Sequence, residues 1–204
     1  MRLFAKACYK AVSGKIIVST DFLFFFAAAL LLVPIQWLVA WILALTVHEL
    51  CHYIALRLCG GAVTRIQIGC RGVIMDTQPL SFGREALCAY AGPLGGLIIL
   101  LFARFFPRTA ICSLVFSLYN LLPILPLDGG RGLGCLLKKI FPTTIAERVL
   151  GYVENSVLMG VFAISLYSVF RLGLGLLPAF IAVILFLRSK QIKIPCKKRQ
   201  LGLQ

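Results

Sequence analysis

The pattern H-E-x-x-H occurs once in this chain, in the stretch Val47-His48-Glu49-Leu50-Cys51-His52-Tyr53. It lies inside an apolar run that extends from Ile35 to Leu58. On a helix, His48 and His52 are one turn apart, so both imidazoles can reach one metal ion. Glu49 is then placed to take a proton from a water bound to that metal. The chain contains two histidines, and both belong to this pattern.

The alternative interpretation of the pattern is that it has no function. Chance produces H-E-x-x-H in roughly one chain in a few hundred, and two histidines on a soluble helix would be ordinary surface residues. Here the surrounding run is apolar enough for the interior of a membrane. Ionisable groups are costly there and normally mark a function. The apolar context therefore favours a metal site.

Composition indicates a membrane protein. Hydrophobic residues make up 60% of the 204 residues, above the about 45–50% of soluble domains. We predict an all-α polytopic membrane protein with about six transmembrane helices and a small membrane-associated β-hairpin or sheet. It forms one integral membrane domain over residues 1–204. Its parts are a catalytic core of about 14–140, additional helices of about 145–187, and a basic cytoplasmic tail over 188–204.

The predicted spans follow from the apolar runs and the breaks between them. They cover about 20–33, 35–59, 84–106, 109–127, 145–170 and 172–187. In the third span, Gly92 and Gly96 form a G-x-x-x-G face for close helix contact. A short amphipathic helix is expected to follow the fourth span as far as Ile140.

Strand-like residues lie between the second and third spans. The runs Val63–Ile68 and Gly72–Asp76 flank a predicted turn, and Ile16–Val18 is a further candidate strand. The hairpin is either a plain surface connector or an edge that pairs with an extended peptide substrate.

The charge distribution fits this topology. The net charge is +14, and with six spans and a cytoplasmic N-terminus only Arg104, Arg108 and Arg171 face outward, leaving 18 of the 21 Lys and Arg inside. This agrees with the positive-inside rule, and it explains the basic balance without a nucleic-acid partner. Both termini are predicted to be cytoplasmic. The histidine pair and Asp128 are both predicted to lie toward the cytoplasmic side.

A catalytic zinc ion usually has three protein ligands and one open position that holds water. Because the chain has no third histidine, the third ligand must be a carboxylate or a cysteine. Asp128 is favoured, since it follows a helix end broken by Pro123 and Pro126, and such an end is tolerated at membrane depth only where it lines a cavity. Asn120, about two turns earlier, either hydrogen-bonds substrate or makes an interhelical hydrogen bond.

Three segments together make the chain similar to the site-2 protease family (peptidase family M50) of intramembrane zinc metalloproteases. They are His48–His52, Gly60–Ile66 leading to Ala91–Leu94, and Asn120–Arg131. The resemblance implies a core of the second to fourth spans, with Zn²⁺ on His48, His52 and Asp128. It also implies Glu49 as the catalytic acid and base.

The same resemblance implies a membrane-associated sheet, made of about Ile16–Val18 and the hairpin, that presents an unwound substrate strand. The Gly-Gly pair usual in this hairpin appears here as Arg71-Gly72, which we assign to substrate binding. The compact six-span form is similar to the stage IV sporulation protein FB branch. This implies a bacterial cell membrane, a membrane-protein substrate such as a membrane-tethered sigma-factor precursor, and a regulatory membrane protein as partner.

A non-enzymatic alternative is a metal-binding transporter or an inactive homologue that acts as a scaffold. A transporter is expected to carry polar residues along several spans, whereas here they concentrate at one end. An inactive homologue is expected to lose Glu49, because zinc binding does not require it. The presence of Glu49 therefore favours the protease.

Overall fold

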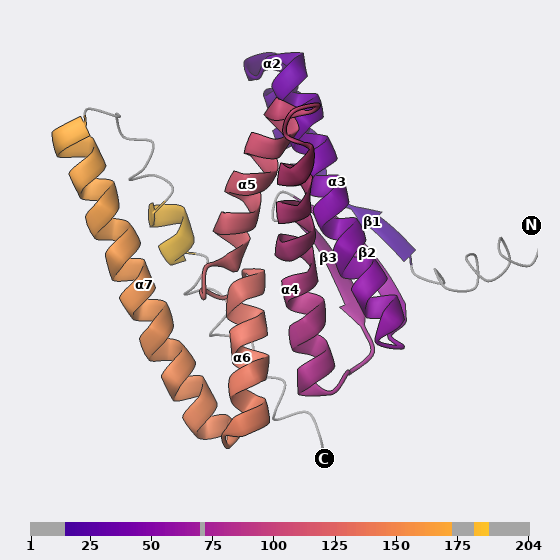
Figure 1. Ribbon diagram of the computed structural model, residues 1–204, viewed down its shortest axis with the longest axis vertical. Coiled ribbons are helices and arrows are strands. Elements are labelled where there is room, and N and C mark those ends of the chain that lie inside the picture. The colour runs from indigo at the N-terminus through magenta and orange to yellow at the C-terminus, as the bar shows by residue number, and fades with distance from the viewer. Residues whose placement is uncertain (1–14, 70–71, 173–181, 188–204) are drawn as a thin grey trace, which may run out of the picture. The chain divides into compact units, whose positions relative to one another are not determined.

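The computed structural model describes residues 15–69, 72–172 and 182–187 (Figure 1). Three sequence predictions fall outside these residues: Arg71 in the hairpin turn, most of the sixth span, and the basic tail. The chain divides into two compact units, residues 1–118 and 119–204. The prediction of a single membrane domain stays a prediction.

The first unit contains a three-stranded sheet in the order β1-β2-β3. Strand β1 (Lys15–Val18) runs parallel to β2 (Val63–Gly69), and β2 runs antiparallel to β3 (Gly72–Thr77). Gly69 pairs with Gly72 at the turn, and the register shifts between Val63 and Arg65. The predicted hairpin and the predicted short first strand are both confirmed, and β3 lies at an edge of the sheet (Figure 1).

Helix α3 (Ile35–Leu58) carries the histidine pair and has well-defined ends. It is separated from α2 (Thr20–Leu32) by Pro34, which has no amide hydrogen to continue a helix. At the other end, Gly60 adopts φ +79°. Its amide donates to Arg57 O and the Gly61 amide donates to Leu56 O, at 3.1 and 2.9 Å. This is a Schellman arrangement, in which a glycine accepts the left-handed conformation that ends the helix.

Two further helices complete the first unit. Helix α4 (Phe82–Ile98) continues as a 3₁₀ turn, η1 (Ile99–Phe102), and packs along α3. Helix α5 (Pro107–Leu121) follows, and the boundary between the two units falls in its last turn.

The second unit is built on a helical hairpin. Helices α6 (Asp128–Ile140) and α7 (Thr143–Leu172) pack together, and residues 182–187 are also helical. Helix α6 confirms the short helix predicted to end at Ile140. A Cβ placed on Gly134 would lie 3.2 Å from Leu150 Cδ2, so the two helices meet closely there. The core of this unit is apolar: Ile124, Leu127, Leu158 and Leu185.

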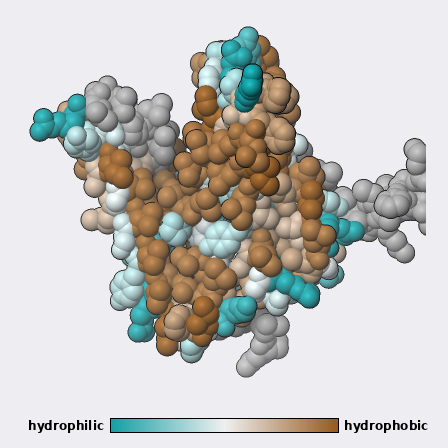
Figure 2. Space-filling model, in the orientation of Figure 1, coloured by the Kyte–Doolittle hydropathy of each residue, from teal (hydrophilic) through white to brown (hydrophobic). Residues whose placement is uncertain are grey.

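Three helices among the described residues are long and apolar enough to cross a membrane: Ile35–Leu58, Phe82–Phe102 and Thr143–Arg171. Apolar side chains also cover much of the described surface in view (brown in Figure 2). Length and composition therefore support an integral membrane protein. The count of six spans is not confirmed. Helices α2 and α5 have 13 and 15 residues, fewer than the about 20 needed to cross the hydrocarbon core without tilt or thinning.

Candidate metal centre

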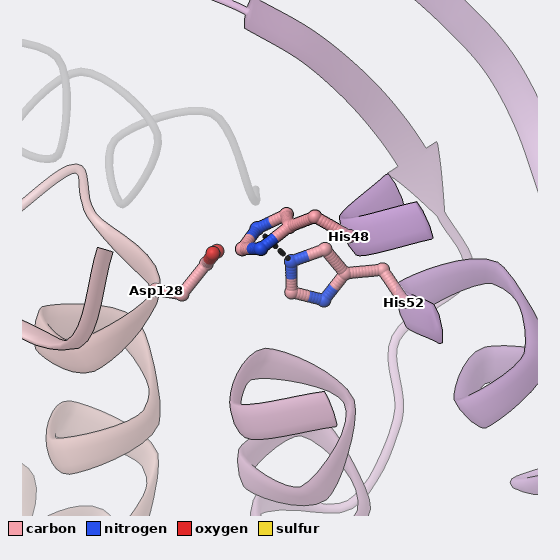
Figure 3. Close-up of side chains that lie close together, drawn as sticks. All are labelled: His48, His52 and Asp128. Atoms are coloured by element: carbon pink, nitrogen blue, oxygen red, sulfur yellow. Dashed lines mark hydrogen bonds between the residues drawn. The ribbon is translucent and has the colours of Figure 1, made fainter. Parts of the chain in front are cut away.

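The two histidines of α3 converge within the first unit. Their Nε2 atoms are 3.1 Å apart, and the rings meet edge to face with centroids 4.7 Å apart (Figure 3). Two nitrogens bound tetrahedrally to one zinc ion at 2.0–2.1 Å lie about 3.4 Å from each other. The pair is therefore already close to the spacing that a shared metal ion requires.

A main-chain carbonyl determines which ring nitrogen of His52 carries the hydrogen. Its Nδ1 lies 2.7 Å from the carbonyl oxygen of Cys88, on α4. A carbonyl oxygen only accepts hydrogen bonds, so Nδ1 must be the donor. In a neutral ring the hydrogen is then absent from Nε2, whose lone pair is left for a metal. Metal-binding histidines commonly have this outer hydrogen bond.

His48 is held by an aromatic contact. Its side chain is only 2% exposed, and its ring meets that of Phe116 on α5 at a centroid distance of 4.7 Å and an angle of 73°. Such an edge-to-face arrangement is favourable for aromatic rings. The two ligand candidates on α3 are thus oriented by two other helices of the same unit.

Small residues on α4 allow the helices around the pair to approach. A Cβ on Gly95 would overlap Cys51 on α3, and a Cβ on Gly96 would overlap the Ser117 hydroxyl on α5. Ser113 donates a hydrogen bond of 2.8 Å to Gly96 O. The close contact predicted for Gly96 is confirmed.

Glu49 follows His48 directly on α3 and is half-buried. Glu49 lies close to both histidines because all three residues belong to consecutive turns of one helix, as the sequence predicts. Its role as acid and base stays a prediction.

Asp128 is the first residue of α6, in the second unit. Gly129 and Gly130 follow it, and a Cβ on either would overlap backbone atoms of residues 121–125. The first turn of α6 therefore packs against the backbone of residues 121–125, and this contact fixes the position of Asp128 at the start of the helix. A carboxylate at a helix N-terminus is also favoured by the helix dipole.

The donor set fits a metal ion. His48, His52 and Asp128 each offer one ligand atom, two imidazole nitrogens and one carboxylate oxygen (Figure 3). This is a donor set of catalytic zinc sites, although the atoms alone do not select zinc. Of the predicted substrate-binding residues, Asn120 lies half-buried in the last turn of α5 and Gly72 opens β3. Arg71 lies outside the described residues, and all three roles stay predictions.

Sequence reasoning did not find the Cys88 carbonyl or Phe116. A backbone carbonyl has no side-chain signature, and Phe116 lies in an apolar helix where an aromatic residue is unremarkable. A pairing partner for His52 can be recognised only once α3 and α4 are placed side by side.

No protein-family model and no curated protein matches this chain. Among solved structures, it is similar to the "Site-2 Protease from Methanocaldococcus jannaschii", with a TM-score of 0.57 and 19% sequence identity. The match covers 88% of this chain and 91% of that chain. At this identity the match shows the fold and does not extend to the sporulation branch. The chain therefore shares its fold with a site-2 protease structure over most of its length.

Proposed function

We propose that this chain is an intramembrane metalloprotease that hydrolyses peptide bonds of membrane-embedded or membrane-tethered proteins. The observation that carries the proposal is the pair of His48 and His52 Nε2 atoms 3.1 Å apart on α3, a helix long and apolar enough to cross a membrane. Glu49 lies beside the pair in the same helix. H-E-x-x-H is a zinc-protease motif, and packing alone does not explain three ionisable residues inside a helix long enough to cross a membrane.

In this proposal, Asp128 supplies the third ligand. Support comes from the donor chemistry of the three side chains and from the fixed start of α6. The ion is proposed to be zinc, which lowers the pKa of a bound water and polarises a peptide carbonyl. Glu49 takes a proton from the attacking water and gives a proton to the leaving amine. The half-buried position of Glu49 suits a group that works apart from bulk water.

The substrate is proposed to be a membrane protein, presented as an extended strand beside β3. An edge strand offers unpaired backbone groups that an unwound substrate can use. Arg71, Gly72 and Asn120 are proposed to contact it. A cytoplasm-facing site, a bacterial cell membrane, a regulatory partner and a role in sporulation are proposals that rest on charge distribution and family resemblance.

The decisive experiment compares wild type with Glu49→Gln, which removes the base and leaves the proposed ligands. Both are purified in detergent, analysed for bound metal, and incubated with a panel of single-span membrane proteins. Glu147→Gln is the matched control, because Glu147 makes a surface ion pair with Lys138 in the second unit. We expect about one zinc per chain in all three and cleavage by wild type and the control only. Undiminished cleavage by Glu49→Gln, or wild type that binds no metal, contradicts the proposal.

A further inference from the structure

We infer that Gly92 is a positioning residue for the metal centre, and that together with the Cys88 carbonyl it holds the His52 ring where Nε2 can bind the ion. The inference rests on the proposed function in one respect, namely that His52 is a metal ligand. It assigns a role to a glycine one helical turn beyond Cys88 on α4, a helix that contributes no ligand side chain of its own.

The first observation is the space at Gly92. A Cβ at this position would overlap His52 Nε2, and it would lie 2.5 Å from Cε1 and 2.6 Å from Cδ2. All three atoms belong to the edge of the ring that would face the metal. The volume that any other residue would fill at position 92 is therefore the volume that Nε2 needs.

The second observation is the hydrogen bond at the opposite edge of the ring. Nδ1 donates to Cys88 O at 2.7 Å, so α4 holds the ring by one nitrogen and leaves room for the other. This arrangement places Nε2 at 3.1 Å from its counterpart on His48. Gly92 and the Cys88 carbonyl thus both position the His52 ring, and both belong to α4.

These contacts limit what the ring can do if position 92 gains a methyl group. One response is rotation of the His52 ring, which breaks the bond to Cys88 and carries Nε2 away from His48. The other is separation of α4 from α3, which lengthens the same bond. The first response moves the two ligand nitrogens apart, and the second weakens the hydrogen bond that orients the His52 ring.

Gly95 provides a matched control on the same helix. A Cβ there would overlap Cys51 Sγ and lie 2.7 Å from its Cβ, so Gly95→Ala also strains the contact between α3 and α4. The side chain that it displaces is not one of the proposed ligands. A defect specific to Gly92→Ala would therefore report on the imidazole, whereas an equal defect would report on helix spacing.

The test uses full-length protein in detergent as wild type, Gly92→Ala and Gly95→Ala. Zinc affinity is measured by competition with a chromophoric chelator, the ligand geometry by the visible absorption of bound Co²⁺, and stability by thermal unfolding. For Gly92→Ala we expect a zinc Kd raised by about 10- to 100-fold, typical of lost outer-sphere support, with an altered Co²⁺ spectrum. Gly95→Ala should keep a Kd within about threefold of wild type, even if it unfolds at a similarly reduced temperature.

A second measurement does not depend on whether Gly92→Ala folds. Because the chain has two histidines, ¹⁵N-histidine labelling gives two rings to assign, and a His48→Gln variant identifies them. In the metal-free protein, His52 should carry its hydrogen on Nδ1. A hydrogen on Nε2, an unchanged zinc Kd in Gly92→Ala, or an equal loss in both glycine variants overturns the inference. Failure of wild type to bind Zn²⁺ or Co²⁺ instead contradicts the proposed function itself.

Discussion

Replacing Phe116 by leucine should weaken metal binding through His48 without removing any ligand. In the structure, the rings of Phe116 and His48 meet at 4.7 Å and 73°, and His48 is almost fully buried. Leucine keeps an apolar side chain at this position on α5 and removes the aromatic edge contact. His48 then loses the contact that orients its ring from α5.

The size of the effect follows from the contact that is lost. An aromatic pair of this kind contributes about 0.5–1.5 kcal/mol beyond its buried area. If the whole of that energy serves to hold the ring in its metal-binding orientation, the Kd for zinc rises by about 2- to 13-fold. This is an upper limit, because some of the contact energy also stabilises the metal-free protein.

The assay is chelator competition on purified Phe116→Leu, with Val115→Ala as the control. Val115 is the preceding residue on α5 and is 63% exposed, so its truncation should leave the Kd unchanged. A Phe116→Leu Kd equal to that of wild type would refute the argument that the aromatic contact orients His48. Complete loss of binding would refute the magnitude, since one edge contact cannot account for it.

Three further outcomes are expected. Ser113→Ala should lower the free energy of unfolding by about 1 kcal/mol, because Ser113 donates to Gly96 O. Ser117→Ala should change it by less than about 0.5 kcal/mol, since its buried hydroxyl has no hydrogen-bond partner among the described residues; equal losses in denaturant unfolding would contradict this contrast. Glu154, 1% exposed in α7, should tolerate glutamine, which keeps its size and polarity, while alanine should lower the free energy of unfolding by about 1–3 kcal/mol by truncating a buried polar side chain. Free Zn²⁺ at about 100 times its Kd should stabilise wild type by about 2.7 kcal/mol in thermal unfolding, and a shift retained by His52→Gln would exclude that ligand.

Much of the helical framework could be predicted because its signals are local. Pro34 and Gly60 mark the two ends of the helix that carries the histidines, and both ends lie where the sequence places them, within a residue. The β2–β3 hairpin is also confirmed. A hairpin can be predicted from local sequence, because its two strands and the glycine-containing turn between them are neighbours in the chain. The pairing of β1 with β2 joins segments about 50 residues apart. Local sequence predicts the strand, and only the family resemblance places it in one sheet with the hairpin.

Prediction was weaker where apolar sequence had to be converted into membrane crossings. The run before Pro123 was predicted as a span ending near residue 127, whereas α5 ends at Leu121. Proline disfavours helical geometry in the residue before it and clashes with the carbonyl four residues earlier, so a helix stops short of the proline. Hydropathy alone does not contain that information.

The candidate site shows the same division between local and tertiary information. The spacing of His48 and His52 is a property of one helix and can be read from the sequence, because three residues separate them. Their usable orientation is not, because it depends on a carbonyl of Cys88 from α4 and a ring of Phe116 from α5. An H-E-x-x-H pattern therefore specifies which atoms could bind a metal, while the neighbouring helices determine whether those atoms point at one place. In this chain the glycines of α4 are what permit that approach. A sequence that kept the two histidines and filled positions 92 and 96 with larger residues would match the pattern and lose the geometry.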